Sequence, residues 1–366
     1  MDFSTELVNT NTLIREIIEE INNNYADEIA KEKLEIGAIN GILATLDEYS
    51  TYISQDEFDT FTQLTRGTFL GIGVEIKQIR EGIEISSIID ESPAAIAGLK
   101  ISDVITNIDG RDVSDMNFKD IVSKLSSDSA LKMKVSVTRN KTEKFDVTLK
   151  KSVIQLQSVK LYFRGDIAVI KITCFNDGTL VGVSQAIKTL HRKQSKGVIL
   201  DLRNNPGGIL TQAINVCDMF LANKKIVEFK SRNENESKIV FSDGKDLLDG
   251  LPMVVLIDSC TASGGELVAA ALGENKRAIL IGEKTYGKGS LQSVIPIPGK
   301  GAIKLTTAYL ISPNGNAINQ NGVPPDIEII DGNQRPTDKQ ESDPIVLRAV
   351  DLIHGISALS ELENKR

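Results

Sequence analysis

Two residues of this chain have side chains that could catalyse hydrolysis together, one as nucleophile and one as base. Ser263 precedes two glycines, and Lys288 stands between two glycines. A serine hydroxyl is a poor nucleophile unless a base takes its proton, and histidine is the usual base. The only histidines are His191, near the end of an expected helix, and His354, in an expected C-terminal helix. Neither is expected near the serine, so lysine is the remaining candidate base.

A lysine must be neutral to act as a base. Its ordinary pKa is about 10.4, and burial lowers the pKa by disfavouring the charged form. Gln292 follows Lys288 by four residues and shares its face if 288–292 is a strand, so its amide is expected to orient the amine. The expected donors to a developing oxyanion are the backbone N–H groups of Gly207 or Gly208, and of Gly264. Together these residues predict a Ser–Lys hydrolase.

The elements around these residues predict how they are brought together. Apolar strands are expected at 197–203, 252–258 and 277–283, alternating with helices at 178–194, 209–221 and 263–273. This alternation indicates βαβ units and a largely parallel sheet. The loops that follow the three strands are RNNPGG, SCTASGG and KTYGKG. Such loops lie at the carboxyl edge of the sheet, where ligands bind, so the serine and the lysine are expected to converge there.

Each signal has a simpler interpretation when taken alone. A serine before GG is commonly a helix N-cap, and PGG is commonly a turn. Lys284 competes with Lys288, but its place next to the strand favours a surface role. Cys260 is interpreted as a buried spectator rather than a nucleophile. The prediction therefore depends on the joint arrangement of the three loops.

The remaining sequence predicts four regions. They are a helical N-terminal region (1–64), a small strand-rich domain (65–150) with short helices at 92–99 and 117–125, an α/β core (151–330), and a polar linker with a final helix (331–366). Two amphipathic helices are expected within 13–21 and 34–46.

Composition excludes several classes of protein. The net charge of −8 and the pI of about 5.1 argue against nucleic acid as a partner. Three widely spaced cysteines support neither a disulfide framework nor a zinc site, and no metal or other cofactor is expected. The sequence has no apolar run near the length of a membrane span, and no basic-then-apolar signal segment at its start. A cytosolic protein and a trimmed secreted one both fit these observations.

The chain resembles the carboxyl-terminal processing, or tail-specific, serine proteases. The matching stretches run in the family's order and include LDEYSTYI, RGTFLGIGVEI, ESPAAIAGLKISDVITNIDG, VILDLRNNPGG, SCTASGGELVAAALGENKRAILIGEKTYGKGSLQ and NGVPPDIEI. The resemblance implies a crotonase/ClpP-like αβ protease core with an inserted PDZ domain and helical N- and C-terminal regions. It also implies Ser263 as nucleophile, Lys288 as base and Gln292 as assistant. Glu274 stands where some members carry an aspartate, and we assign it no catalytic role.

The resemblance identifies the strand-rich domain as a PDZ domain. The expected peptide site combines a carboxylate-binding loop with one wall of helix 117–125. Its residues are Leu70, Gly71, Ile72, Gly73, Ile121 and Leu125. Consecutive N–H groups would grip a peptide's terminal carboxylate while the peptide adds as a strand. Alternatively, GIG is an ordinary glycine bulge.

The family implies protein or peptide substrates bound through their C-termini, and a periplasmic or extracytoplasmic location. Two other functions stay open: a non-catalytic PDZ peptide-binding or chaperone protein, and a small-molecule enzyme or binder. The presence of both Ser263 and Lys288 favours the protease. The natural substrate, homo-oligomerisation, and whether the PDZ domain inhibits or activates are left open by the sequence.

Overall fold

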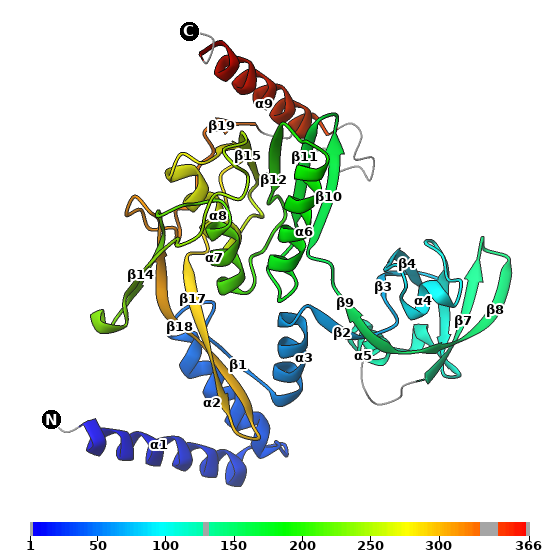
Figure 1. Ribbon diagram of the computed structural model, residues 1–366. Coiled ribbons are helices and arrows are strands. Elements are labelled where there is room, and N and C mark those ends of the chain that lie inside the picture. Colours follow the sequence, from blue (N-terminus) through cyan, green and yellow to red (C-terminus); the bar gives the residue numbers. More distant parts are fainter. Residues whose placement is uncertain (1–2, 127–131, 330–342, 364–366) are drawn as a thin grey trace. The chain divides into compact units, whose positions relative to one another are not determined.

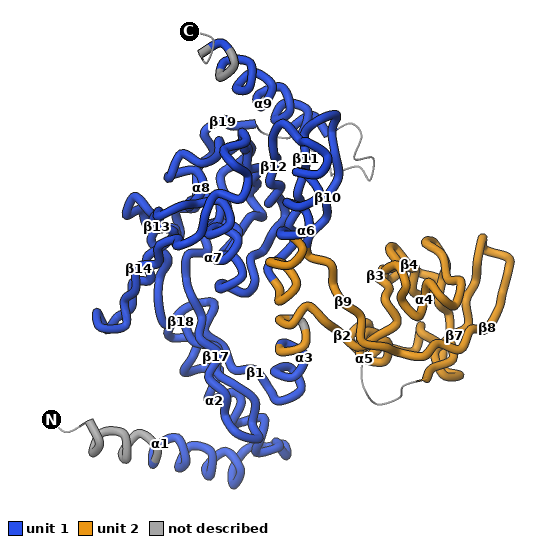
Figure 2. Tube along the Cα trace, in the orientation of Figure 1, with its two compact units in different colours: residues 1–61, 159–175, 183–366 blue, residues 62–158, 176–182 orange. Residues whose placement is uncertain are grey.

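The computed structural model describes residues 3–126, 132–329 and 343–363. It divides into two compact units (Figure 2). Unit 1 comprises residues 1–61, 159–175 and 183–366, and unit 2 comprises residues 62–158 and 176–182. Boundaries were expected at 64/65 and 150/151, whereas the main breaks fall at 61/62 and 158/159, and residues 176–182 of the expected core fall in unit 2. Most of the expected polar linker lies outside the described residues.

A six-stranded sheet forms the centre of unit 1 (Figure 1). Its strands are β10 (Val159–Arg164), β11 (Ile167–Ile172), β12 (Gly197–Asp201), β15 (Met253–Ile257), β16 (Ile279–Gly282) and β19 (Ile327–Glu328), in the order β10-β11-β12-β15-β16-β19. Only β10 pairs antiparallel; every other pairing is parallel. All residues of β12 and β15 are buried, as expected for a parallel sheet covered on both faces.

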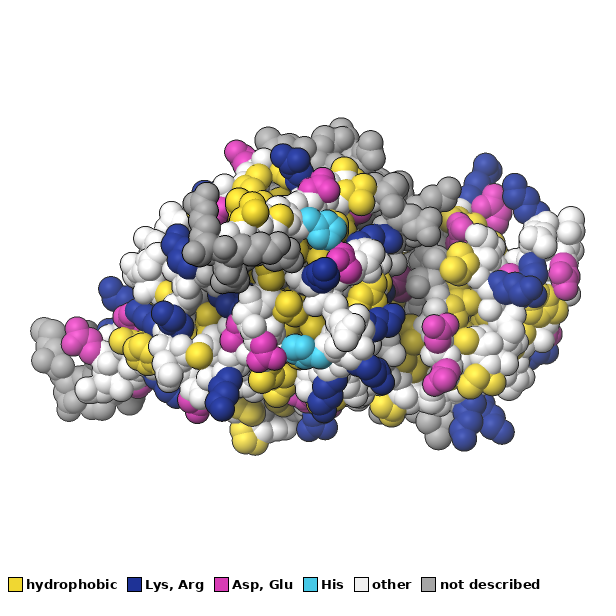
Figure 3. Space-filling view, turned by 45° about the horizontal axis from the view of Figure 1, so that its top comes forward, with side chains coloured by type: hydrophobic (Ala, Val, Ile, Leu, Met, Phe, Trp, Pro, Cys, Tyr) yellow, Lys and Arg dark blue, Asp and Glu magenta, His cyan; other side chains and the backbone are white. Residues whose placement is uncertain are grey.

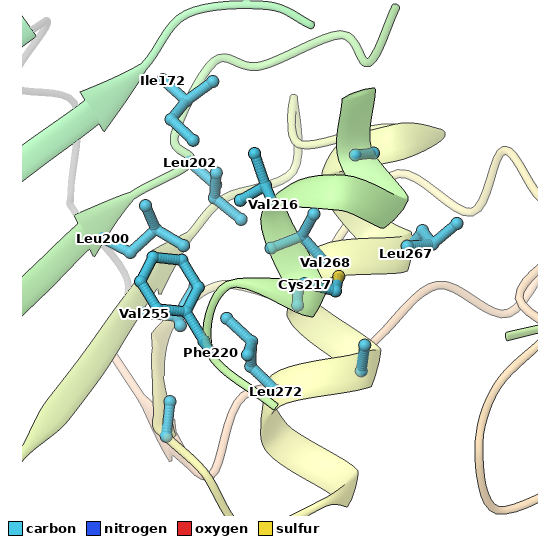
Figure 4. Close-up of a cluster of buried hydrophobic side chains, with 14 of the residues drawn as sticks. Ile172, Leu200, Leu202, Val216, Cys217, Phe220, Val255, Leu267, Val268 and Leu272 are labelled. Atoms are coloured by element: carbon cyan, nitrogen blue, oxygen red, sulfur yellow. The ribbon is translucent and has the colours of Figure 1, made fainter. Parts of the chain in front are cut away.

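Helices cover both faces of this sheet. On one face lie α6 (Thr179–Arg192, from Val183 onward), α7 (Leu210–Asp218) and α8 (Gly264–Glu274). Figure 4 shows Leu200 and Val255 of the strands with Val216 of α7 and Val268 of α8. On the other face, α9 (Pro344–Glu363) buries Ile345, Val346, Ala349 and Ile353. The sheet is therefore held from two sides, which gives the loops at its carboxyl edge a rigid base.

A second sheet of unit 1 receives the N-terminal part of the chain. Helices α1 (Phe3–Asn24) and α2 (Lys31–Ala44) are followed by β1 (Thr51–Ile53), which pairs antiparallel with β18 (Gly301–Ile311). The other strands of this sheet are β13 (Lys225–Ser231), β14 (Lys238–Phe241) and β17 (Ser290–Ile297). Among the described helices, none is both long and apolar enough to cross a membrane. The pairing of β1 with β18 places the turn just before residue 51 beside a strand that follows Lys288.

Unit 2 is an antiparallel domain with its own core. Helix α3 (Gln55–Thr65) leads into β2 (Thr68–Gly71), which pairs with β9 (Ser152–Gln155). The main sheet has the order β3-β4-β5-β7-β8, with β6 pairing β5; its strands are β3 (Val74–Ile79), β4 (Gly82–Ile88), β5 (Val104–Ile108), β6 (Arg111–Asp112), β7 (Lys132–Arg139) and β8 (Glu143–Lys150). The helices are α4 (Pro93–Ile96), the 3₁₀ turn η1 (Val113–Asp115) and α5 (Phe118–Ser126). Among the described strands of this sheet, β3 lies at the edge and pairs with β4 alone.

Candidate active site

The three predicted loops follow three adjacent parallel strands, β12, β15 and β16, and they are joined by backbone hydrogen bonds. Ala262 N–H donates to Asn205 O at 2.8 Å, which joins the first loop to the second. Tyr286 N–H donates to Thr261 O at 3.0 Å, which joins the second loop to the third. The convergence at the carboxyl edge is therefore as predicted.

Ser263 occupies a strained turn at the start of α8. Its φ is 53° and its ψ is −113°, a region that glycine normally occupies. Strain of this kind costs about 1–3 kcal/mol and persists only where the surroundings impose it. A Cβ at Gly207 would lie 2.7 Å from the Cβ of Ser263, so only glycine fits there. The PGG loop thus lies directly against the serine.

Glu266 connects the serine turn to the lysine loop. Its side chain is fully buried. One carboxylate oxygen accepts from Ser263 N–H and Lys288 N–H, both at 2.8 Å. The other accepts from Thr285 Oγ1 and Gly287 N–H, both at 2.6 Å. Burial raises the pKa of the carboxyl while the four hydrogen bonds oppose that shift, and since all four partners are donors the site fits the carboxylate form.

Lys288 is half-buried, and its amine lies over an aromatic ring. Nζ is 4.8 Å from the ring centroid of Tyr49. Burial and the nearby charge of Lys304 lower the pKa of the amine, which favours a neutral base. Among the described residues no hydrogen bond joins Nζ to Ser263 Oγ, and the predicted pairing of these two groups stays a prediction.

The expectation that Gln292 holds the lysine through a shared strand face is not met in this structure. Strand β17 begins at Ser290, after the lysine, and its pairing with β18 is irregular between Leu291 and Gln292. Gln292 Nε2 donates to Ser290 Oγ at 2.8 Å and to Thr306 Oγ1 at 3.2 Å. The bulge removes the simple two-residue alternation on which that prediction relied.

The backbone N–H groups predicted to bind an oxyanion differ in whether they already have an acceptor. Gly207 N–H donates to Asn205 Oδ1 at 2.8 Å and is therefore occupied. The N–H groups of Gly208 and Gly264 have no acceptor in the part of the chain that the structure describes. A Cβ at Gly208 would lie 2.2 Å from Phe175 O, so the loop requires glycine there too. Of the alternatives left open by the sequence, Gly208 and Gly264 keep free donors.

The other reactive side chains are placed elsewhere. His191 Nε2 contacts Leu247 O at 2.7 Å, and His354 Nε2 contacts Asp166 Oδ1 at 2.8 Å. Both histidines reach the surface (Figure 3), as does Lys284. Cys260 is exposed, so the expectation that it is buried was wrong.

Glu274 has a structural role at the far end of α8 from Ser263. Its carboxylate accepts from Ser312 Oγ at 2.9 Å and from Asn314 N–H at 2.7 Å. An 11-residue helix is about 16 Å long, so this carboxylate stays remote from the serine.

In unit 2, the predicted peptide site is only partly as expected. Gly71 ends β2, Ile72 and Gly73 join it to β3, and Gly73 has a φ of 80°. Ile121 and Leu125 are 0% and 6% exposed and belong to the core with Ile72, so assigning them to an open groove was wrong. The outer face of α5 instead carries Phe118 and Val122, which are 41% and 40% exposed. Their i, i+4 spacing is the signal that the sequence offered.

Three contributors to the site were missed by sequence reasoning. They are Glu266 as a link between loops, Asn205 as the partner of Gly207, and Tyr49 under Lys288. The S-x-x-E spacing of a capping box pointed to Glu266. Nothing local could have placed Tyr49.

Comparison with known proteins agrees with this arrangement. Residues 166–329 match Peptidase family S41, and residues 71–149 match the PDZ domain. A carboxy-terminal-processing protease of Bartonella bacilliformis is 35% identical over 86% of this chain and 74% of its own length. The carboxy-terminal processing protease CtpA of Bacillus subtilis is 34% identical over 85% of this chain and 67% of its own length.

Solved structures show the same fold. A photosystem II D1 C-terminal processing protease has a TM-score of 0.52 at 24% identity, covering 87% of this chain and 92% of that one. A putative S41 protease from Bacteroides fragilis has a TM-score of 0.57 at 15% identity, covering 86% and 88%. The protein is thus a serine-type peptidase in class, with an αβ core and a PDZ domain. It belongs to peptidase family S41, the carboxy-terminal-processing proteases.

Proposed function

We propose that this protein is a serine endopeptidase that cleaves protein substrates near or from their C-terminal end, with Ser263 as nucleophile and Lys288 as base. One observation carries the proposal. A single buried carboxylate, Glu266, binds the backbone N–H groups of both residues, each at 2.8 Å. The two loops are therefore joined through one carboxylate, which keeps the backbone of Lys288 close to the turn that carries Ser263.

The chemistry follows from these positions. Neutral Lys288 takes the proton of Ser263 Oγ as that oxygen attacks the substrate carbonyl carbon, and the resulting oxyanion accepts from Gly208 and Gly264 N–H. The lysine ammonium then gives the proton to the leaving amine. Water then attacks the acyl carbon as the same lysine takes its proton, and the lysine ammonium returns that proton to Ser263 Oγ as the acyl C–O bond breaks and the carboxylic acid product leaves.

The PDZ domain supports selection of substrate C-termini. The free edge of β3 offers a place for an added peptide strand, and residues 71–73 stand at the start of that strand. The exposed side chains of Phe118 and Val122 favour an apolar residue at the peptide's end. Substrates are therefore proposed to bind through a free, apolar C-terminus.

The dyad is tested by substitution. Ser263→Ala and Lys288→Ala are each expected to lower kcat by about 10⁴-fold or more, because dyad members act as one unit. Lys284→Ala is the matched control, since that lysine is exposed and lies four residues away. A serine-reactive phosphonate should label Ser263. Near wild-type cleavage by Lys288→Ala would overturn the mechanism.

The peptide site is tested with paired substrates. Amidating the substrate C-terminus removes its charge, and hydrogen bonds to an ionised acceptor are about twice as strong as those to a neutral one. We expect amidation to reduce cleavage at limiting substrate, and Val122→Asp to weaken binding of the free C-terminus. Equal cleavage of amidated and free substrates would refute C-terminal recognition.

An extracytoplasmic location and self-association remain proposals. The resemblance to the family supports the first, which cell fractionation tests. Sedimentation of the purified protein tests the second.

A further inference from the structure

The lysine amine rests on a segment from a distant part of the chain. Nζ of Lys288 is 4.8 Å from the ring centroid of Tyr49, within the range of a cation–π contact of about 6 Å. The two residues are 239 positions apart (288 − 49). Tyr49 belongs to residues 47–50, which we call the 47–50 turn, directly before β1.

The 47–50 turn is firmly held. Asp47 Oδ1 accepts from Tyr49 N–H at 2.8 Å and from Ser50 N–H at 2.7 Å. Ser50 Oγ accepts from Thr306 N–H at 3.2 Å, and the following strand β1 pairs with β18. The ring is therefore positioned by the sheet and does not simply follow the lysine.

The same strand, β18, also binds Gln292. The side-chain amide of Gln292 donates to Thr306 Oγ1 at 3.2 Å, and the backbone N–H of the same Thr306 donates to Ser50 Oγ. In the described structure Lys288 thus contacts the 47–50 turn, whereas Gln292 binds β18. The two side chains are not hydrogen-bonded to each other.

We propose that Tyr49 is a positioning residue that holds the Lys288 ammonium in a resting place over its ring, from which the amine must leave to take the proton of Ser263. The inference rests on the proposed function of Lys288 and adds the element that restrains it. The negative face of the ring attracts the charged amine more than the neutral one, so the ring favours the form that cannot act as a base.

Several charged groups face the amine from the surrounding elements. Lys304 on β18 and burial lower the pKa of Lys288, while Glu266 on α8 and Glu48 in the 47–50 turn raise it. The hydroxyl of Tyr49 lies beside Glu48 and Tyr286, and burial with these neighbours raises its pKa, so the ring stays neutral. The ring therefore adds to the effect of the two glutamates.

The proposal is tested by titrating Lys288 directly. Protein with ¹³C-labelled lysine side chains is prepared in a Ser263→Ala background, and a Lys288→Gln sample assigns the signal. Replacing Tyr49 by leucine should lower the pH at which the Lys288 amine is half protonated by about half to one pH unit. Tyr49→Phe, which keeps the ring, should stay close to wild type. Tyr52→Leu is the matched control, since the Tyr52 hydroxyl donates to Lys300 O instead.

A second arm removes only the electrostatics of the ring. Pentafluorophenylalanine at position 49 keeps the approximate size of phenylalanine but reverses the partial charge on the face of the ring. It should therefore lower the titration midpoint of Lys288, as leucine does. This variant still tests the proposal if Tyr49→Leu fails to fold. In the active protein, Tyr49→Leu should raise kcat about 3- to 10-fold below the midpoint and leave KM unchanged.

The outcomes separate the inference from the proposed function. The inference would be overturned if the titration midpoint of Lys288 stayed the same with leucine or pentafluorophenylalanine at position 49. A fall in kcat of Tyr49→Leu at every pH would overturn it too. Cleavage that survives Ser263→Ala or Lys288→Ala would instead overturn the proposed function, while the titration would still report whether the ring holds the amine.

Discussion

Among the described residues, unit 1 buries the carboxylates of Asp201 and Glu266 and unit 2 buries that of Asp103, and Glu266 and Asp103 are bound differently. In unit 1, Glu266 accepts from three backbone N–H groups and one hydroxyl, all neutral. In unit 2, Asp103, which is 1% exposed, accepts from the Arg139 guanidinium at 2.7 and 2.8 Å and from Lys100 N–H at 2.8 Å. The first carboxylate arranges loops, whereas the second neutralises a charge.

The two carboxyl groups accordingly have pKa values shifted in opposite directions. Burial raises the pKa of Glu266, because no opposite charge is bound to it. Burial acts on Asp103 too, but the hydrogen bonds and charge of Arg139 outweigh it and lower the pKa. Glu266 is thus held by neutral donors that link two loops, while Asp103 is held by a cation.

Removing the charge of Glu266 gives the largest expected effect. Glu266→Gln keeps the shape but turns an NH₂ group toward two donors, which lose their acceptor. Leaving buried donors unsatisfied should lower the free energy of unfolding by about 3 kcal/mol. Misplacement of the serine and lysine loops should lower kcat by about 100-fold, as small displacements of reacting groups do. Chemical denaturation and steady-state kinetics measure both.

Glu274→Gln is the control, because it lies on the same helix but binds the turn at residues 312–314. It should reduce stability while sparing kcat. Equal losses of kcat from the two variants would break the contrast between an organising and a merely structural carboxylate.

The next effect belongs to unit 2. Asp103→Asn leaves Arg139 without its counter-charge and should destabilise unit 2 by about 2 kcal/mol, less than a fully buried pair because Arg139 is partly exposed. Amide hydrogen exchange can follow unit 2 separately from unit 1. Asp146→Asn, which removes an exposed pair with Lys134, should have a much smaller effect.

The same pair predicts a dependence on pH. The folded pKa of Asp103 lies below its unfolded value of about 3.9, so its contribution is complete above that pH and is lost as the pH falls through the folded pKa. Wild-type unit 2 should lose protection in acid more steeply than the Asp103→Asn variant. Parallel pH curves for the two proteins would contradict this assignment.

The smallest effect is expected at Gln292, which binds only hydroxyl groups here. If Gln292 orients the amine once Lys288 leaves Tyr49, Gln292→Ala should lower kcat by about 5-fold and leave KM unchanged. Thr306→Val, which frees the amide from Thr306, should not reduce kcat. A change confined to KM would make Gln292 a substrate contact.

The sequence by itself determined the parallel sheet and the meeting of its three loops. Strand–helix alternation forces the carboxyl ends of β12, β15 and β16 to one edge, so Ser263 and Lys288 had to approach each other whatever the details of packing. The strands could be recognised in the sequence because they are short runs of apolar residues. Short β-like runs predicted the strand-rich domain between β2 and β9, and the structure supplied its antiparallel pairing.

Only the tertiary structure decided which groups occupy the site around that edge. The contact of Tyr49 with Lys288 joins residues 239 positions apart (288 − 49) through the pairing of β1 with β18, which no local pattern encodes. The burial of Ile121 and Leu125, with Phe118 and Val122 outside, depends on how α5 is rotated against its sheet. Hydrogen-bond partners such as Asn205 for Gly207, or Thr306 for Gln292, depend on distances of a few tenths of an ångström, and these are set only when the whole core is packed.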